Sequence, residues 1–368
     1  MDDAPVTEPA AEPLPPASPR LLTLSVATGV SAVLLAVLSA LPLPYVVDAP
    51  GPTRDTLGGD AQGPFITIDG ASSYPTTGKL LLTTVSVFGG PGHPLDLGTV
   101  VKGWLSGSSS VLPVEAVYPP DESQKQAEQQ SQADMVSSQE NATVAALEEL
   151  GYTVPTKLTV AGTADATGAR GVVQVGDVLV GLNSATLGSF SDLSRAVDAI
   201  PPGSPLTLHV LRAGTPMDLP VKTTDDGHGR SLIGVLVDPT FTLPVDVKIR
   251  ISDIGGPSAG TMFALGIIDK LTAEDEAKGA VIAGTGTMDL SGRVGPIGGI
   301  EQKMAGAVND GATWFLAPAE NCGDVVGHIP SGLHVARVAT LHEARLAVQA
   351  IGADPAAAAR TLPTCTSG

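Results

Sequence analysis

The chain has 368 residues, of which 43% are hydrophobic and only 3% aromatic, and it carries a formal net charge of −18. This length is enough for two or three domains, whose cores must be built mainly from aliphatic side chains. The acidic balance argues against a nucleic-acid-binding surface, which needs clustered lysine and arginine. We therefore expect a globular protein that does not bind nucleic acid.

The N-terminal region divides into a polar tail and an apolar run. Residues 1–20 are rich in proline, alanine and glutamate and lack periodicity, which predicts a disordered tail. Residues 21–43 contain no charged residue and are numerous enough to cross a membrane. They predict one transmembrane helix, and a cleaved signal peptide is the alternative. Arg20 precedes the run, which favours a cytoplasmic tail and an extracytoplasmic remainder, anchored in the cell membrane by a single span.

Residues 45–150 have the pattern of a mixed segment. Strands are expected at 45–53, 65–68 and 79–87. A long helix is expected over 126–150, where Met135, Ala142 and Ala146 lie near one face. Together with the segments that follow, this gives an α+β fold class.

Residues 156–223 predict a small β-rich domain. The turn Gly176-Asp177-Val178-Leu179 leads into a strand, a helix follows from Phe190 to Ile200, and the segment 206–214 ends in Val210-Leu211-Arg212-Ala213-Gly214. These elements, in this order, resemble a bacterial PDZ domain. The resemblance implies a groove that binds an extended peptide beside a helix. A β-rich spacer that binds nothing is the alternative.

A strand, a turn and a helix are predicted around Ser258. Apolar and polar residues alternate over 245–251, which is typical of a half-buried strand, and Gly255, Gly256 and Pro257 then break the pattern. From Ser258 the apolar spacing becomes helical. Backbone N–H groups at the start of a helix can stabilise an oxyanion, and glycines let a substrate backbone approach closely. Ser258 is therefore a candidate nucleophile.

Lys303 is the candidate base for this serine. If residues 300–308 are helical, Lys303 lies on the same apolar face as Ile300, Met304 and Ala307. Burial disfavours the ammonium and can lower a lysine pKa enough for the amine to act as a general base near neutral pH. The alternative is a surface lysine whose stem covers apolar side chains while its amine stays in water.

The whole segment closely resembles the proteolytic domain of Lon-type proteases. The family's Gly-Pro-Ser-Ala-Gly turn corresponds to residues 256–260, and its Gly-Gly-Ile/Leu-x-x-Lys segment to residues 298–303. The resemblance implies a dyad of Ser258 and Lys303, supported by Thr285, Gly256 and Pro257. Two further segments between Ser258 and Lys303 match the family in order. They are Thr285-Gly286 and Gly292-Arg293-Val294-Gly295-Pro296-Ile297-Gly298-Gly299. In the family the equivalent of Thr285 positions the lysine.

The complete arrangement resembles the membrane-anchored Lon-like proteases of Gram-positive bacteria. The proteolytic domain would comprise residues 45–150 and 230–352, with the PDZ-like domain inserted over 156–223. No phosphate loop of an ATPase is found in the sequence. The resemblance implies a serine endopeptidase that hydrolyses unfolded or flexible proteins outside the cytoplasm and that assembles into a homo-oligomeric ring. No cofactor and no metal are expected, since the histidines lack metal-ligand spacing.

The C-terminal end combines one clear helix signal with a loose tail. Thr340-Leu341-His342-Glu343 is a capping box that starts a helix ending near Ile351. Residues 353–368 are rich in alanine and proline and predict a flexible tail. Cys322 and Cys365 are the two cysteines, and either a disulfide or two thiols is compatible with the sequence.

Two other functions are compatible with parts of the sequence. Gly256-x-Ser258-x-Gly260 also fits the nucleophile turn of α/β-hydrolases, which would need an acid and a histidine downstream. The candidates are Asp289, Asp310 and Asp324 with His328, His334 and His342. The second alternative is a catalytically inactive membrane adaptor that presents peptides through its PDZ-like domain.

Overall fold

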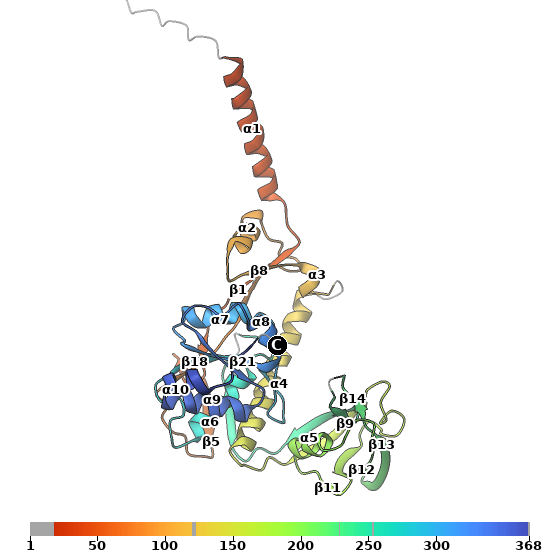
Figure 1. Ribbon diagram of the computed structural model, residues 1–368. Coiled ribbons are helices and arrows are strands. Elements are labelled where there is room, and N and C mark those ends of the chain that lie inside the picture. The colour runs from red at the N-terminus through yellow and green to blue at the C-terminus, as the bar shows by residue number, and fades with distance from the viewer. Residues whose placement is uncertain (1–17, 120–122, 228, 252–253, 367–368) are drawn as a thin grey trace, which may run out of the picture.

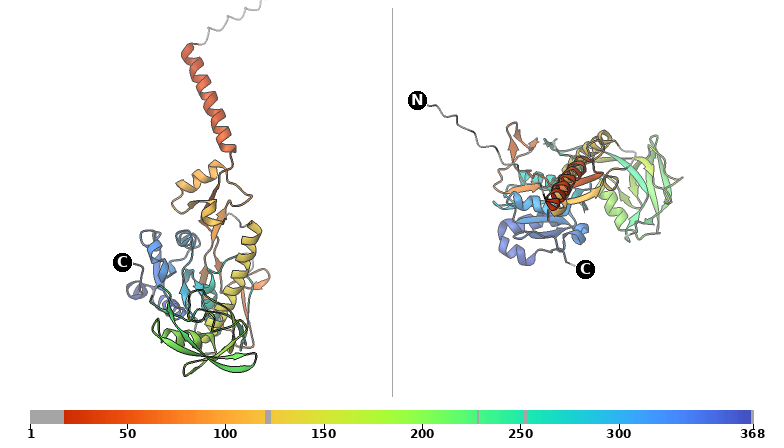
Figure 2. Two further views of the ribbon diagram at one scale, coloured as in Figure 1. Left: turned by 90° about the vertical axis from the view of Figure 1, so that its right-hand side faces the viewer. Right: turned by 90° about the horizontal axis from the view of Figure 1, so that it is seen from above.

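The computed structural model describes residues 18–119, 123–227, 229–251 and 254–366. Figures 1 and 2 show three parts: a projecting N-terminal helix, a mixed helical and sheet domain, and a smaller β-rich domain at its side. The first seventeen residues, most of the predicted tail, lie outside the described residues. The mixed helix and strand content agrees with the predicted α+β class.

Helix α1 (Pro19–Ala40) covers most of the apolar run and extends away from the other elements (Figure 1). Large apolar side chains along it are exposed, such as Leu24 and Val33. The helix ends before Pro42, so residues 41–43 of the predicted span lie outside it. Across the described ranges, no helix is long and apolar enough to cross a membrane. The prediction of a transmembrane helix over 21–43 is therefore not confirmed.

A three-stranded antiparallel sheet follows α1. Strand β1 (Tyr45–Pro50) lies between β7 (Val85–Phe88) and β8 (Ser110–Pro113), and the short helices α2 (Leu97–Leu105) and α3 (Val114–Val117) adjoin it. The sequence predicted one strand over 79–87, but the structure has β6 (Lys79–Leu82) and β7 in different sheets. The side chain of Thr83 donates to the Gly284 carbonyl and that of Thr84 to the Pro52 carbonyl, which fixes the change of direction between them.

The central sheet of the larger domain has five strands. Its order is β2 (Arg54–Asp55), β6, β18 (Val281–Gly284), β21 (Trp314–Pro318) and β22 (His334–Val338), and all neighbours are parallel except β2 and β6. Alternate residues of β6 point to opposite faces: Leu80 and Leu82 join one buried cluster and Leu81 joins another. A parallel sheet covered on both faces is the expected arrangement for such strands.

Helices cover the two faces of this sheet. The first buried cluster includes residues of α4 (Gln124–Glu149), α6 (Gly260–Leu271) and α9 (Leu341–Ala353). The second includes residues of α7 (Ile300–Asn309) and α8 (Cys322–Val325). The remaining short elements of the domain are β3 (Gly59–Asp60), β4 (Gly63–Pro64), β5 (Ile66–Asp69), β17 (Asp246–Ile249), β19 (Thr287–Met288), β20 (Val294–Gly295) and the 3-10 helix η1 (Ala319–Asn321). Lys303 lies on α7, and Ser258 lies on the turn just before α6, so the two helices beside the candidate residues cover opposite faces of one sheet.

The β-rich domain has its own sheet and its own core. Its strands are β9 (Thr156–Thr163), β10 (Val178–Leu182), β11 (Ala185–Thr186), β12 (Pro205–Arg212), β13 (Thr215–Lys222), β14 (Thr224–Asp225), β15 (Ser231–Leu232) and β16 (Val235–Phe241). The sheet order is β13-β12-β10-β9-β16, and helix α5 (Phe190–Asp198) packs into the same buried cluster. The predicted boundary at 223 is too early, because β16 pairs along β9 and Ile233 is buried in this core.

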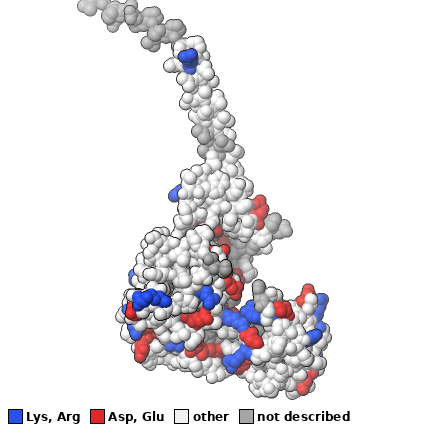
Figure 3. Space-filling model, in the orientation of Figure 1, with Lys and Arg blue, Asp and Glu red and all other residues white. Residues whose placement is uncertain are grey.

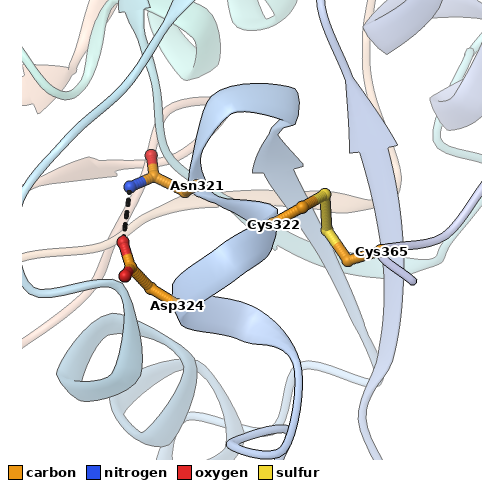
Figure 4. Close-up of a disulfide and its surroundings, with 4 residues drawn as sticks. All are labelled: Asn321, Cys322, Asp324 and Cys365. Atoms are coloured by element: carbon orange, nitrogen blue, oxygen red, sulfur yellow. Dashed lines mark hydrogen bonds between the residues drawn. A yellow bond between two sulfur atoms is a disulfide. The ribbon is translucent and has the colours of Figure 1, made fainter. Parts of the chain in front are cut away.

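The C-terminal residues are more ordered than the sequence suggested. The predicted helix after Thr340 is present as α9, and Thr340 accepts from the Glu343 N–H. The tail that was predicted to be flexible contains helix α10 (Pro355–Thr361), whose Ala358 is buried. Cys365 is joined to Cys322 of α8 by a disulfide with the two Cα atoms 5.0 Å apart (Figure 4). The bond and the buried alanine hold the tail against the domain.

Candidate active site

Ser258 lies on a turn whose backbone requires glycine. Gly256 has φ = +82°, a left-handed conformation that a side chain would strain. The Gly256 N–H donates to the Ser131 carbonyl at 2.8 Å, and the Ser138 hydroxyl donates to the Pro257 carbonyl at 3.0 Å. Both partners belong to α4, so this helix braces the turn from behind. The sequence predicted the turn, but it did not predict this support.

The helix after the turn begins two residues later than expected. α6 starts at Gly260, and Pro257 and Ser258 lie before it on the turn. A Cβ atom at Gly260 would be 2.8 Å from the Met288 Cβ and 3.0 Å from the Ser138 hydroxyl. Because only glycine fits there, helix α6, α4 and strand β19 can meet directly behind Ser258. The close packing fixes the turn relative to the rest of the domain.

Lys303 is buried, as its place on the apolar face of α7 predicted. Its side chain is 4% exposed, and Ile300, Met304 and Ala307 on the same face are buried as well. Desolvation by this burial lowers the pKa of Lys303 from its ordinary value of 10.5 to about 7. A substantial fraction of the amine is therefore uncharged near neutral pH. The alternative of a surface lysine with a solvated amine is wrong.

Thr285 connects the lysine with the serine residue. The Lys303 Nζ donates to the Thr285 Oγ1 at 3.1 Å, and the Thr285 Oγ1 donates to the Ser258 backbone carbonyl at 3.1 Å. The same carbonyl accepts from the Gly286 N–H at 2.9 Å. Thr285 is completely buried. The side chains of Lys303 and Thr285 and the backbone of Ser258 are thus brought together from three separate segments of the chain.

A pocket of about 600 Å³ opens at this point, and both Ser258 and Lys303 line it. Gly255, Pro257, Thr287 and residues 296–298 form one part of the lining. The other part comes from the N-terminal region and consists of Pro52, Arg54, Thr84, Val85 and Ser86. This second set was not predicted from the sequence, because its residues lie in two short segments far from the serine in the chain.

The Ser258 N–H is available to a bound group. Among the described residues it donates to no protein acceptor, and it lies just ahead of the N-terminus of α6. A negatively charged oxygen near this position would meet an unpaired donor and the positive end of the helix dipole. The turn therefore has the features of an oxyanion site.

The three histidines of the alternative hydrolase mechanism lie elsewhere. None of them is among the described residues that line the pocket. His342 pairs with Glu149, His328 contacts the Asp324 carbonyl, and the His334 ring stacks on Trp314. Asp324 itself accepts from Asn321 beside the disulfide (Figure 4). The described part of the chain also holds no group of three or more metal-ligating side chains.

A serine on a glycine-dependent turn and a buried lysine of lowered pKa, both on one pocket, are the elements of a serine peptidase that uses lysine as its base. Comparison with known proteins identifies the type. Residues 241–345 match the sequence profile of the Lon protease (S16) C-terminal proteolytic domain. This part of the chain is similar to the serine peptidase domain of Lon proteases.

Individual Lon proteases align with the same region. Lon protease 1 of Bacillus subtilis is 34% identical over 93 residues, which are 24% of this chain and 12% of that protein. Lon protease of Rhizobium meliloti is 32% identical over 120 residues, which are 30% of this chain and 15% of that protein. The chain thus spans only about an eighth of the length of these relatives.

Solved structures similar to the chain include PDZ domains. The PDZ domain of an SdrC-like protein from Listeria innocua is 17% identical, with a TM-score of 0.21, and the alignment covers 22% of this chain and 92% of that domain. The corresponding domain from Listeria monocytogenes gives the same identity and TM-score, over 22% of this chain and 85% of that domain.

Proposed function

We propose that this protein is an endopeptidase in which Ser258 is the nucleophile and Lys303 is the general base. The observation that carries the proposal is the buried lysine, whose pKa is about 7 and whose amine is linked through Thr285 to the serine residue. A serine hydroxyl needs such a neighbouring base before it can attack a carbonyl.

The reaction follows from the roles of these groups. The Ser258 Oγ attacks the carbonyl carbon of a peptide bond while the neutral Lys303 amine takes its proton. The new oxyanion is stabilised by the Ser258 N–H and the start of α6. The lysine then returns the proton to the leaving amine, and water hydrolyses the acyl-enzyme by the same steps. Thr285 holds the amine in position during both stages.

We propose flexible or unfolded chains as substrates. The pocket lies between two parts of the domain, the segment 254–258 and residues 84–86, and an extended chain can enter it more easily than a folded one. The PDZ-like domain would hold such a chain, because β16 has β9 as its sheet partner and ends the sheet, where an extended peptide can add as a strand. A homo-oligomeric ring is part of the same proposal.

We also propose that the protein is attached to the cell membrane and that the peptidase domain is extracytoplasmic. The disulfide between Cys322 and Cys365 supports an oxidising compartment. α1 and the region of α2 are nearly free of charged residues on the face shown in Figure 3, whereas charges gather over the two domains below. The exposed apolar side chains of α1 support attachment at residues 21–43. Fractionation of cells and protease protection of the C-terminal domains would test both points.

The test of the activity uses the full chain purified in detergent. Wild type is expected to cleave an unfolded, fluorescently labelled casein without added nucleotide, and Ser258→Ala and Lys303→Met are expected to abolish cleavage. The variants His328→Gln, His334→Gln and His342→Gln should retain it. Loss of cleavage in one histidine variant, or a strict requirement for ATP, would contradict the proposal. Cleavage by none of the proteins, wild type included, would favour an inactive adaptor.

A further inference from the structure

The hairpin of β19 and β20 has its base at the catalytic pocket. Thr285 and Gly286, which both hydrogen-bond the Ser258 carbonyl, lead directly into β19. Thr287 of β19 and residues 296–298 after β20 line the pocket together with Ser258 and Lys303. A shift of this end of the hairpin would change the position of Thr285. The position of the Lys303 amine relative to Ser258 would then change as well.

The tip of the same hairpin holds helix α5 of the β-rich domain. The Arg293 Nη2 donates to the Asp198 carboxylate, with which it forms an ion pair, and to the Ser194 Oγ at 3.3 Å. The Ser191 hydroxyl donates to the Glu148 carboxylate of α4, and its oxygen lies 3.4 Å from the Leu290 carbonyl. Leu290 also shares a buried cluster with Phe190, the first residue of α5. Ser191, Ser194 and Asp198, spread along α5, therefore contact one turn of the peptidase domain.

The hairpin is stiff enough to carry a displacement from its tip to its base. The Asp289 Oδ1 accepts from the Ser291 N–H at 2.8 Å and from the Arg293 N–H at 2.9 Å. The tip is also bonded to α9, because the Gly292 carbonyl accepts from the Leu341 N–H at 2.7 Å. Because these hydrogen bonds join residues 289, 291, 292 and 293 to one another and to α9, a movement of Arg293 is passed on to the strands beside the tip.

The contact with α5 itself is loosely packed. Arg293 and Asp198 line two cavities, of about 460 Å³ and 440 Å³. Ile200, Pro201 and Arg230 of the β-rich domain line the second. Arg293 and Asp198 are partly exposed, at 35% and 42% of their side-chain surface. A partly exposed contact that lines two open clefts can shift when the β-rich domain changes its position.

We propose that Arg293 is a positioning residue for the Ser258–Lys303 pair, and that its contact with α5 makes the activity of the peptidase domain depend on how the PDZ-like domain is docked. The inference rests on the proposed function. In the docked state, Asp198 and Ser194 hold Arg293, the hairpin holds Thr285, and Thr285 holds the lysine amine. Undocking leaves the serine and lysine in place but weakens their alignment.

The test measures hydrolysis of a fluorogenic tetrapeptide amide, a small substrate for a pocket whose described lining includes no residue of α5. Arg293→Gln and Asp198→Asn should each lower kcat about tenfold with little change in KM, because misalignment affects the reacting groups more than binding. Their kcat should also depend on pH with the midpoint of wild type, since neither change alters the burial of Lys303. Arg195→Gln, on the same helix and paired with Asp192 at 3.6 Å, is the matched control and should retain the wild-type kcat.

The charge-exchanged double variant Asp198→Arg with Arg293→Asp separates positioning from a general loss of structure. It should recover most of the lost kcat, whereas each exchanged single variant should not. Thermal unfolding of every variant confirms that the domain is folded. If folded Arg293→Gln and Asp198→Asn both keep the wild-type kcat, the inference is wrong while the proposed peptidase stands. If wild type itself fails to hydrolyse the peptide, the proposed function fails first.

Discussion

Replacing Lys303 by methionine should change how the stability of the protein depends on pH. The folded protein holds this amine at a pKa of about 7, and the unfolded chain holds it near 10.5. Between these values the unfolded state binds more protons, so the free energy of unfolding rises with pH across this window. From pH 6 to pH 9 this one group should add ~2.7 kcal/mol to the stability of wild type. Lys303→Met keeps a long apolar side chain and removes the titration.

The assay is urea unfolding at pH 6, 7.5 and 9, followed by tryptophan fluorescence, to which the buried Trp314 contributes. All other titrating groups are shared, so the difference between wild type and Lys303→Met isolates the lysine. We expect that difference to change in favour of wild type by about 2.7 kcal/mol as the pH rises. The rate of Ser258 labelling by a fluorophosphonate should fall in wild type below pH 7. Unfolding free energies that change in parallel in the two proteins would refute a desolvated lysine.

Three further changes test the structure around the site. Thr285→Val removes the hydroxyl between the amine and the serine carbonyl, and it should slow labelling of the serine by about tenfold to a hundredfold in a folded protein. Gly260→Ala places a methyl group 2.8 Å from Met288 and should lower stability by about 1–3 kcal/mol in urea unfolding, whereas Gly323→Ala, with no atom within 4 Å, should not. Cys322→Ser removes a disulfide whose cysteines are 43 residues apart, and it should lower the free energy of unfolding by about 4 kcal/mol. Reductant should lower the free energy of unfolding of wild type by the same amount and leave that of the variant unchanged.

The elements around the site were predictable because each has a strong local pattern. The alternation before the turn, the glycines at 255 and 256, and the apolar stripe that includes Lys303 all appear in the sequence within about ten residues of the group they position. Helical spacing placed Lys303 on an apolar face but left a surface lysine as the alternative, and the resemblance of the whole segment to Lon-type proteases favoured burial. The assignment to the Lon-type domain followed from several such segments in one order, which is a stronger signal than any single motif.

The features that the sequence missed depend on contacts between distant segments. The support of the turn by Ser131 and Ser138 joins residues more than 100 positions apart, and the second half of the pocket comes from residues 52–86. The division of residues 79–87 into β6 and β7 rests on hydrogen bonds to Gly284 and Pro52. The order of the C-terminal tail rests on a disulfide that composition cannot show. Such contacts override local propensity because they exist only in the folded chain.

The way in which the β-rich domain joins the peptidase domain has a consequence for the ancestry of the chain. Its first and last strands, β9 and β16, pair side by side, and the Thr242 N–H donates to the Pro155 carbonyl at 2.9 Å. The chain thus leaves and re-enters the larger domain at almost one point. A whole module could be acquired or lost there by a single genetic event, and the surrounding domain would need only a short turn to close the gap.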